Sequence, residues 1–183
     1  MARKDAREVA MKLLYQKDLS GEADFDSLLR MEPHYSIHEK DKEYILSLLN
    51  LFESHAQEID GHIKSFSKGW EFNRIARVDL AILRLALCEI LYRPDIPVSV
   101  SINEAVELAK KFSSDKSGKF VNGVLGGFIR SKRIASEEHM VPEGQTASEG
   151  KITTDKQTAS EEKIATQEQI ASDEKVKAEE KPQ

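Results

Sequence analysis

The stretch of sequence that decides the fold runs from Arg74 to Tyr92 and reads RIARVDLAILRLALCEILY. Its apolar residues cover most of the circumference of a helix, which is typical of a helix that is buried on nearly all sides. Pro94 and Pro97 follow and interrupt the helical pattern. We therefore expect this segment to form a central helix with other helices packed around it.

The segments before this helix also show helical periodicity. In the first one, apolar residues recur at the spacing of one helical face: Ala6, Val9, Ala10, Leu13 and Leu14. Gly21 should end that helix, and a short helix is expected over residues 25–31, before Pro33. The pattern Ser36-Ile-His-Glu39 resembles a capping box that opens a further helix, and Ile59, Ile63 and Phe66 predict another separate one.

Two more helices are predicted after Pro97. The pattern Ser101-Ile-Asn-Glu104 resembles a second capping box, and Ser117-Gly118 precedes a last helix that carries Phe120 and Phe128. No stretch alternates convincingly with period two, so a sheet is not expected. The sequence therefore predicts an all-α body.

The C-terminal part differs in composition and is predicted to be a disordered acidic tail over residues 134–183. Four copies of a 12-residue repeat begin at Ile134, Thr146, Thr158 and Ile170. Residues 136–183 hold 12 acidic and 6 basic side chains, which leaves 20 acidic and 21 basic in residues 1–135. Apolar residues are too sparse in the tail to offset the entropy of ordering it. The helical body is accordingly predicted to be one domain that spans residues 1–133.

Signatures of catalysis and of cofactor binding are not found. The sequence contains no phosphate-binding loop and no dinucleotide fingerprint after a strand. Cys88 lies within the apolar central helix and is interpreted as a small buried hydrophobe, and the histidines are interpreted as surface residues rather than metal ligands. No apolar run approaches the length of about 20 residues that a membrane helix needs. We expect a cytoplasmic, non-enzymatic protein without cofactor or metal.

Two groups of basic residues stand out. Arg3, Lys4 and Arg7 lie at the start of the first helix, and Lys116 and Lys119 lie at the start of the last one. Positive charge is unfavourable at a helix N-terminus, and a bound phosphate would compensate for it. For the first group, the alternative that Asp5 and Glu8 neutralise the cations, which then serve solubility, stays equally open.

Several blocks of sequence follow one another in a fixed order from Arg3 to about Arg130. The most specific blocks are Ser101-Ile-Asn-Glu-Ala-Val-Glu-Leu-Ala-Lys110 and Lys119-Phe-Val-Asn-Gly-Val-Leu125. In these blocks the chain resembles the NusB family of transcription antitermination factors. The resemblance implies two packed small helical bundles and binding of boxA, a short single-stranded RNA element of nascent ribosomal RNA transcripts. It also implies pairing with NusE, a ribosomal small-subunit protein, within the RNA polymerase antitermination complex.

The resemblance also implies roles for individual residues. It places Arg3, Lys4, Arg7, Lys116 and Lys119 along one RNA path. The positions that it implies face NusE are Asp79, Glu89, Val98 and Phe120. Cys88 and Val98 stand where the family often has tyrosine, which affects the expected partner surface at Val98.

Two other functions are compatible with the sequence. A protein-interaction scaffold without RNA binding of its own is favoured by the nearly neutral body. A helical domain of the kind found in ribosomal RNA methyltransferases is the other alternative, but those chains continue into a long α/β domain, whereas here the acidic repeat follows.

Overall fold

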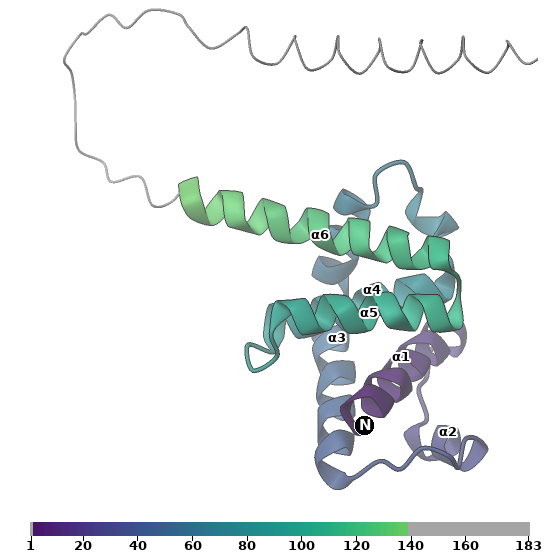
Figure 1. The fold of residues 1–183 in the computed structure, drawn as a ribbon. Helices are drawn as coiled ribbons and strands as arrows, with labels where there is room; N and C mark the ends of the chain where they lie inside the picture. Colours follow the sequence, from purple (N-terminus) through teal and green to yellow (C-terminus); the bar gives the residue numbers. More distant parts are fainter. Residues whose placement is uncertain (1, 139–183) are drawn as a thin grey trace, which may run out of the picture. The chain divides into compact units, whose positions relative to one another are not determined.

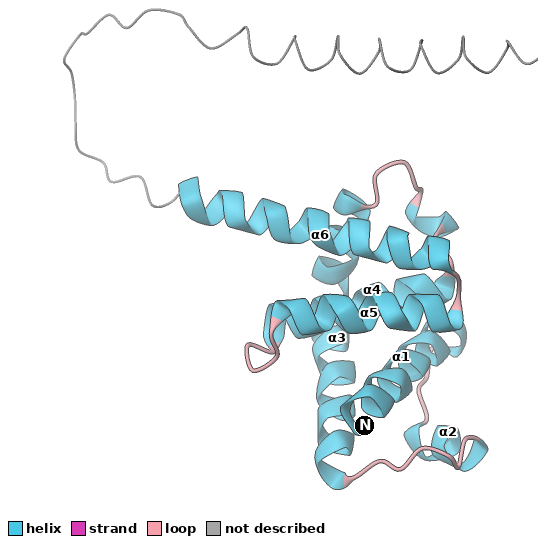
Figure 2. Ribbon diagram, in the orientation of Figure 1, coloured by secondary structure: helices cyan, strands magenta, loops and turns pink. Residues whose placement is uncertain are grey.

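The computed structural model describes residues 2–138 of the chain. Its elements are α1 (Ala2–Ser20), α2 (Phe25–Met31), α3 (Glu39–Phe66), the short 3₁₀-helix η1 (Phe72–Arg74), α4 (Arg77–Tyr92), α5 (Val98–Phe112) and α6 (Asp115–Glu138). The described residues form helices and loops without a strand, which confirms the all-α prediction (Figure 2). Within this range no helix combines the length and hydrophobicity needed to cross a bilayer.

The predicted central helix is confirmed as α4. It contacts α1, α3, α5 and α6, and its residues Ile82, Leu83 and Cys88 are completely buried (Figure 1). Each fully buried aliphatic side chain of this kind contributes about 1.5–3 kcal/mol relative to an exposed one. The apolar circumference noted in the sequence is thus explained by neighbours on several sides.

The remaining helices form two groups that meet on α4. The first contains α1, α2 and the start of α3, and the second contains α5, α6 and the end of α3. In the second group, the ring of Phe128 on α6 lies 4.8 Å from His62 and 5.9 Å from Phe66, both on α3. A side chain at Gly127 would place its Cβ 3.2 Å from the Phe66 ring, so this close approach of α6 to α3 depends on glycine.

Several helix boundaries were predicted correctly. Helix α1 ends at Ser20, and Gly21 follows with a positive φ of 83°. Helix α2 ends before Pro33. The start of α6 at Asp115 lies slightly ahead of the predicted one, and its end at Glu138 lies beyond the domain boundary predicted after Arg133. The predicted disorder of residues 139–183 concerns a segment outside the described residues.

Both predicted capping boxes are wrong. Helix α3 begins at Glu39, and its N-cap residue is His38 rather than Ser36. Helix α5 begins at Val98, so Ser101 lies inside the helix and is 1% exposed. Proline needs no hydrogen-bond partner for its nitrogen and is therefore well suited to the beginning of a helix. Pro97 accordingly starts α5 earlier than the serine would.

The two helices predicted on either side of residue 55 are both present, and they meet at a kink within α3. The backbone of His55 has φ −126° and ψ 16°, which departs from helical values, while α3 continues on both sides. The part of α3 before the kink contacts α1 through Asp41 and Glu53, and the part after it contacts α6 through His62 and Phe66.

Cys88 is expected to be almost unreactive in the folded protein. The side chain is fully buried, and burial, helped by the neighbouring charge of Glu89, raises the pKa of its thiol to about 12. Because the thiolate is the reactive form, labelling by Ellman's reagent at neutral pH should be roughly 1,000-fold slower than for a free cysteine. Labelling in denaturant gives the reference rate, and equally rapid labelling of the native protein would contradict this burial.

Candidate nucleic-acid interface

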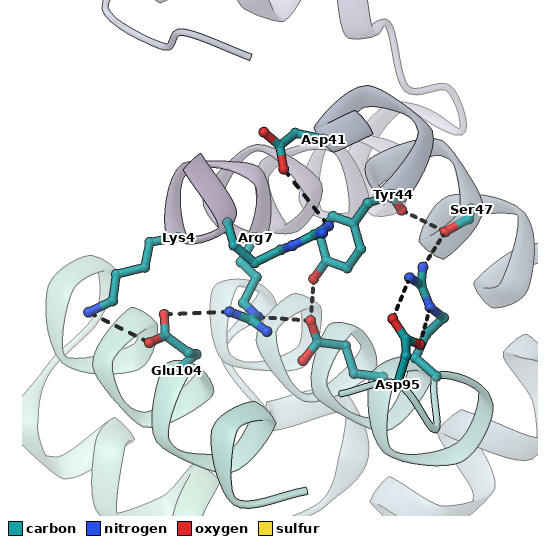
Figure 3. Close-up of polar contacts among 10 residues, drawn as sticks. Lys4, Arg7, Asp41, Tyr44, Ser47, Asp95 and Glu104 are labelled. Atoms are coloured by element: carbon teal, nitrogen blue, oxygen red, sulfur yellow. Dashed lines mark hydrogen bonds and ion pairs between the residues drawn. The ribbon is translucent and has the colours of Figure 1, made fainter. Parts of the chain in front are cut away.

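The first basic group lies at the start of α1, and its two outermost members are exposed but paired. The Nη1 atom of Arg3 lies 3.8 Å from Asp41 Oδ1, and its guanidinium stands 4.3 Å from the centre of the Tyr44 ring (Figure 3). The ammonium of Lys4 lies 3.6 Å from Glu104 Oε1 on α5. Both side chains are open to solvent, so water weakens these ion pairs and a phosphate could compete for the cations.

The third member, Arg7, is different because its side chain points into the protein. It is 5% exposed, and its Nε donates a hydrogen bond of 2.8 Å to Glu89 Oε1. Glu89 is 1% exposed and also accepts a hydrogen bond from the hydroxyl of Tyr44 (Figure 3). Burial, together with the charge of Glu89, raises the pKa of Tyr44 and keeps its hydroxyl protonated as the donor. The charge of Arg7 is therefore used inside the fold.

A second set of polar contacts fixes the turn that leads into α5. Arg93 binds both carboxylate oxygens of Asp95, at 2.9 and 3.0 Å, and donates to the hydroxyl of Ser47 at 2.8 Å. The guanidinium of Arg93 also lies 5.3 Å from the centre of the Tyr44 ring. These contacts hold the segment before Pro97 in place, and they thereby set the position of Val98 at the start of α5 (Figure 3).

The second basic group, at the start of α6, has no carboxylate partner in the described part of the chain. Lys116 and Lys119 are both exposed, and no ion pair is formed by either. The Ser117 N–H donates to the Ser114 hydroxyl at 3.1 Å, which caps one of the free donors of this helix start. The positive end of the α6 dipole and two unpaired ammonium groups therefore coincide.

The two basic groups lie at the starts of different helices, α1 and α6. Helix α5 lies between α1 and α6, as Figure 1 shows. It carries Glu104, which pairs with Lys4, and Glu107, which pairs with Lys110 at 2.7 Å. An RNA that reached from one group to the other would have to cross these carboxylates. The single RNA path past both helix starts stays a prediction.

Two of the four partner positions lie together. Asp79 and Phe120 line the same hollow of about 300 Å³, which is also bordered by Trp70 and Lys116. Asp79 is 5% exposed, and its Oδ1 has no hydrogen-bond partner among the described residues. Such a buried carboxylate oxygen can accept a hydrogen bond from a partner that enters the hollow.

The other two partner positions lie elsewhere. Val98 is 38% exposed at the opposite end of α5 from the start of α6, and a 15-residue helix is about 22 Å long. Glu89 is enclosed by Arg7 and Tyr44, so a partner protein does not reach its carboxylate. Within residues 2–138 there is also no group of three side chains suited to hold a metal ion.

Sequence reasoning missed a third feature, next to the start of α6. Trp70 is 58% exposed, and with Lys68 and Arg130 it borders a second hollow along α6. Arg130 lies 60 residues after Trp70 in the sequence, so no spacing pattern connects it with Lys68 and Trp70. The pair Lys68 and Trp70 was the one signal that the sequence offered.

The fold and these surfaces define a small all-helical domain that presents charged binding surfaces on its outer helices. The family model described as the NusB family matches residues 4–130. The chain therefore belongs to the NusB family.

Known relatives agree with this assignment. The chain is 45% identical over 137 residues to the transcription antitermination protein NusB of Acetivibrio thermocellus, covering 75% of this chain and 94% of the relative. It is 47% identical over 141 residues to the NusB of Alkaliphilus oremlandii, covering 75% and 100%. A crystal structure of antitermination factors NusB and NusE in complex with double-stranded RNA superimposes with a TM-score of 0.63 at 29% identity, covering 71% of this chain and 97% of that one.

Proposed function

We propose that the protein is a transcription antitermination factor that binds boxA-type single-stranded RNA in nascent ribosomal RNA transcripts together with NusE. It acts by binding, without catalysis, as part of the RNA polymerase antitermination complex in the cytoplasm. The relatives named as transcription antitermination proteins support this function, and so does the similar structure that contains NusB, NusE and RNA.

The observation that carries the RNA part is the pair of exposed, unpaired lysines at the start of α6. Lys116 and Lys119 offer two ammonium groups beside a helix N-terminus, so that each can contact one of two neighbouring phosphates. Arg3 and Lys4 form a second, weaker contact, because each must first leave a carboxylate. Phosphate contacts of this kind supply affinity, whereas unpaired bases supply specificity.

The hollow of Asp79 and Phe120 is the proposed contact with NusE. It combines the aromatic ring of Phe120 with the buried Oδ1 atom of Asp79, which has no hydrogen-bond donor among the described residues. Val98 lies apart from it and would contact NusE only through an extended interface. Arg7 and Glu89 have a structural role in this proposal and hold α1 against α4.

The RNA site is tested by the double variant Lys116→Gln/Lys119→Gln. Binding of a boxA-containing single strand should weaken, and the slope of log affinity against log salt should become shallower by about 1.4, since each phosphate contact contributes about 0.7. Filter binding at several salt concentrations measures both quantities. The matched control is Arg30→Gln/Lys40→Gln, which removes two exposed charges from α2 and the start of α3. Equal slopes for both double variants would contradict the site.

The alternative function is a protein-interaction scaffold that leaves RNA binding to its partner. The ion pairs that neutralise Arg3 and Lys4 favour it. The same binding measurement, made with and without NusE, separates the two. RNA binding by the protein alone supports the proposed function. RNA binding that requires NusE and is unchanged in Lys116→Gln/Lys119→Gln supports the scaffold.

A further inference from the structure

A groove runs along the outer side of α6, between this helix and the loop that follows α3. Its volume is about 480 Å³. It is lined by Phe66, Ser67, Lys68, Trp70, Lys119, Phe120, Gly123, Val124, Gly127, Arg130, Ser131 and Ile134. Of this set, the RNA site proposed above uses Lys119, and the proposed NusE contact uses Phe120 in a hollow that Trp70 also borders. The rest of the groove has no assigned role.

The charge of this groove is entirely positive. Lys68, Lys119 and Arg130 are exposed, and none of them forms an ion pair with a carboxylate among the described side chains of residues 3–134. No residue that lines the groove is acidic. This contrasts with the start of α1, where carboxylates of neighbouring helices hold the cations. A polyanion therefore meets less competition in the groove than at α1.

The groove also presents an aromatic surface. Trp70 packs against Phe120 with ring centroids 5.6 Å apart and an interplanar angle of 57°, yet 58% of Trp70 remains exposed. Gly69 precedes it with a φ of 80°, a conformation that other residues rarely adopt, and the Trp70 N–H donates to Ser67 O at 3.0 Å. The position of the Trp70 indole is thus fixed by a tight, hydrogen-bonded turn.

Small residues keep the groove open. A Cβ added at Gly123 would meet nothing within 4 Å, although this glycine lies inside α6, where it costs helix stability of roughly 1 kcal/mol relative to alanine. An extended chain can consequently lie along α6 between Trp70 and Arg130 without meeting a bulky side chain at this point.

We propose that this groove binds an unpaired stretch of the RNA, with one base stacked on Trp70 and the adjoining phosphates on Lys68, Lys119 and Arg130. The proposal rests on the RNA-binding function and extends the site at the start of α6 along that helix. A base must be free of its duplex to stack on a side chain, so the occupant is single-stranded RNA. Cations with interleaved aromatic rings are the usual composition of such sites.

The first test uses the fluorescence of Trp70, the only tryptophan of the chain. Titration of the full-length protein with a single-stranded boxA RNA should quench this fluorescence in a saturable manner. An RNA of about 12 nucleotides is long enough to span one site. A fully paired duplex of the same sequence and inorganic polyphosphate serve as controls, because they supply the charge without an accessible base. Quenching by the single strand alone supports stacking, and equal quenching by polyphosphate overturns it.

The second test uses variants whose affinity for the same RNA is measured by filter binding. Trp70→Ala should weaken binding about 10-fold, since base stacking on one aromatic side chain contributes about that much or more. Trp70→Phe, which keeps a ring, should retain most of the affinity. Gly123→Glu, which places a negative charge in the open space, should weaken binding, whereas Gly123→Ala is the matched control that leaves the groove open. Thermal unfolding confirms that each variant is folded.

The outcomes separate this proposal from the RNA-binding function itself. If Trp70→Ala and Gly123→Glu bind as the parent does while Lys116→Gln/Lys119→Gln is weakened, the function stands and the groove proposal is overturned. If NusE without RNA changes the fluorescence of Trp70 and RNA does not, the groove is a protein contact, and the proposal is again overturned. If the parent does not bind RNA, with or without NusE, the RNA-binding function and the groove proposal are both contradicted.

Discussion

Replacement of Arg7 by alanine is expected to lower the free energy of unfolding by about 3–5 kcal/mol, because it leaves a buried carboxylate without its counter-charge. Arg7 and Glu89 are 5% and 1% exposed, and their 2.8 Å contact joins α1 to α4. The hydroxyl of Tyr44 would be the main remaining donor to Glu89. One neutral donor does not replace the charge of a guanidinium.

Urea denaturation followed by circular dichroism measures this effect. The matched control is Lys4→Ala on the same helix, whose side chain is 71% exposed and whose loss should change stability by no more than ~0.5 kcal/mol. The double variant Arg7→Met/Glu89→Gln, which removes both charges and keeps an acceptor for Tyr44, should recover much of the lost stability. If Arg7→Ala kept its stability but lost affinity for RNA, Arg7 would be a direct RNA contact and the structural role would be wrong.

Replacement of Arg84 by alanine should destabilise the protein to a similar extent. Its guanidinium holds both oxygens of Asp60 at 2.9 Å and Asp18 Oδ1 at 2.7 Å, so it ties α4 to α3 and to α1. Arg84 is 7% exposed, and its guanidinium also lies 5.0 Å from the centre of the Phe52 ring. Its removal leaves two carboxylates close together without a cation, which costs about 3–5 kcal/mol in comparable buried pairs.

This second effect should depend on pH in a defined direction. Burial alone would raise the pKa of Asp18, but hydrogen bonds from Arg84 and Arg77 outweigh it and lower the pKa below the ordinary value. A carboxylate with a lowered pKa in the folded state stabilises the protein above its unfolded pKa of about 3.9, and this contribution is lost as the pH falls through the folded pKa.

The stability difference between the parent and Arg84→Ala should consequently be largest at neutral pH and should narrow on acidification below about pH 4. Urea midpoints at pH 7 and at pH 3 measure the change. A difference that grew as the pH fell would show that the pKa of Asp18 is not lowered by Arg84. Arg77→Ala, whose guanidinium is 58% exposed, is the matched control on the same carboxylate and should have a much smaller effect.

Much of the fold could be predicted from the sequence because it depends on local patterns. The breadth of the apolar surface of residues 77–92 identified the central helix, and Gly21 identified the end of α1. The buried state of Cys88 followed from its place on that central helix. The same reasoning failed at Ser36 and Ser101, because α3 begins after His38 and α5 begins directly after Pro97.

The candidate site could be predicted only in part. The sequence by itself determined that cations stand at the starts of α1 and α6, since those helices are local structures. Only the tertiary structure decided which of these cations is available. Glu89, 82 residues away in the sequence, pairs with Arg7, whereas Lys119 pairs with no described carboxylate and lines the same groove as Trp70. Periodicity records which face of a helix is apolar, but the charge that a ligand encounters depends on which side chains of other helices fold against that face.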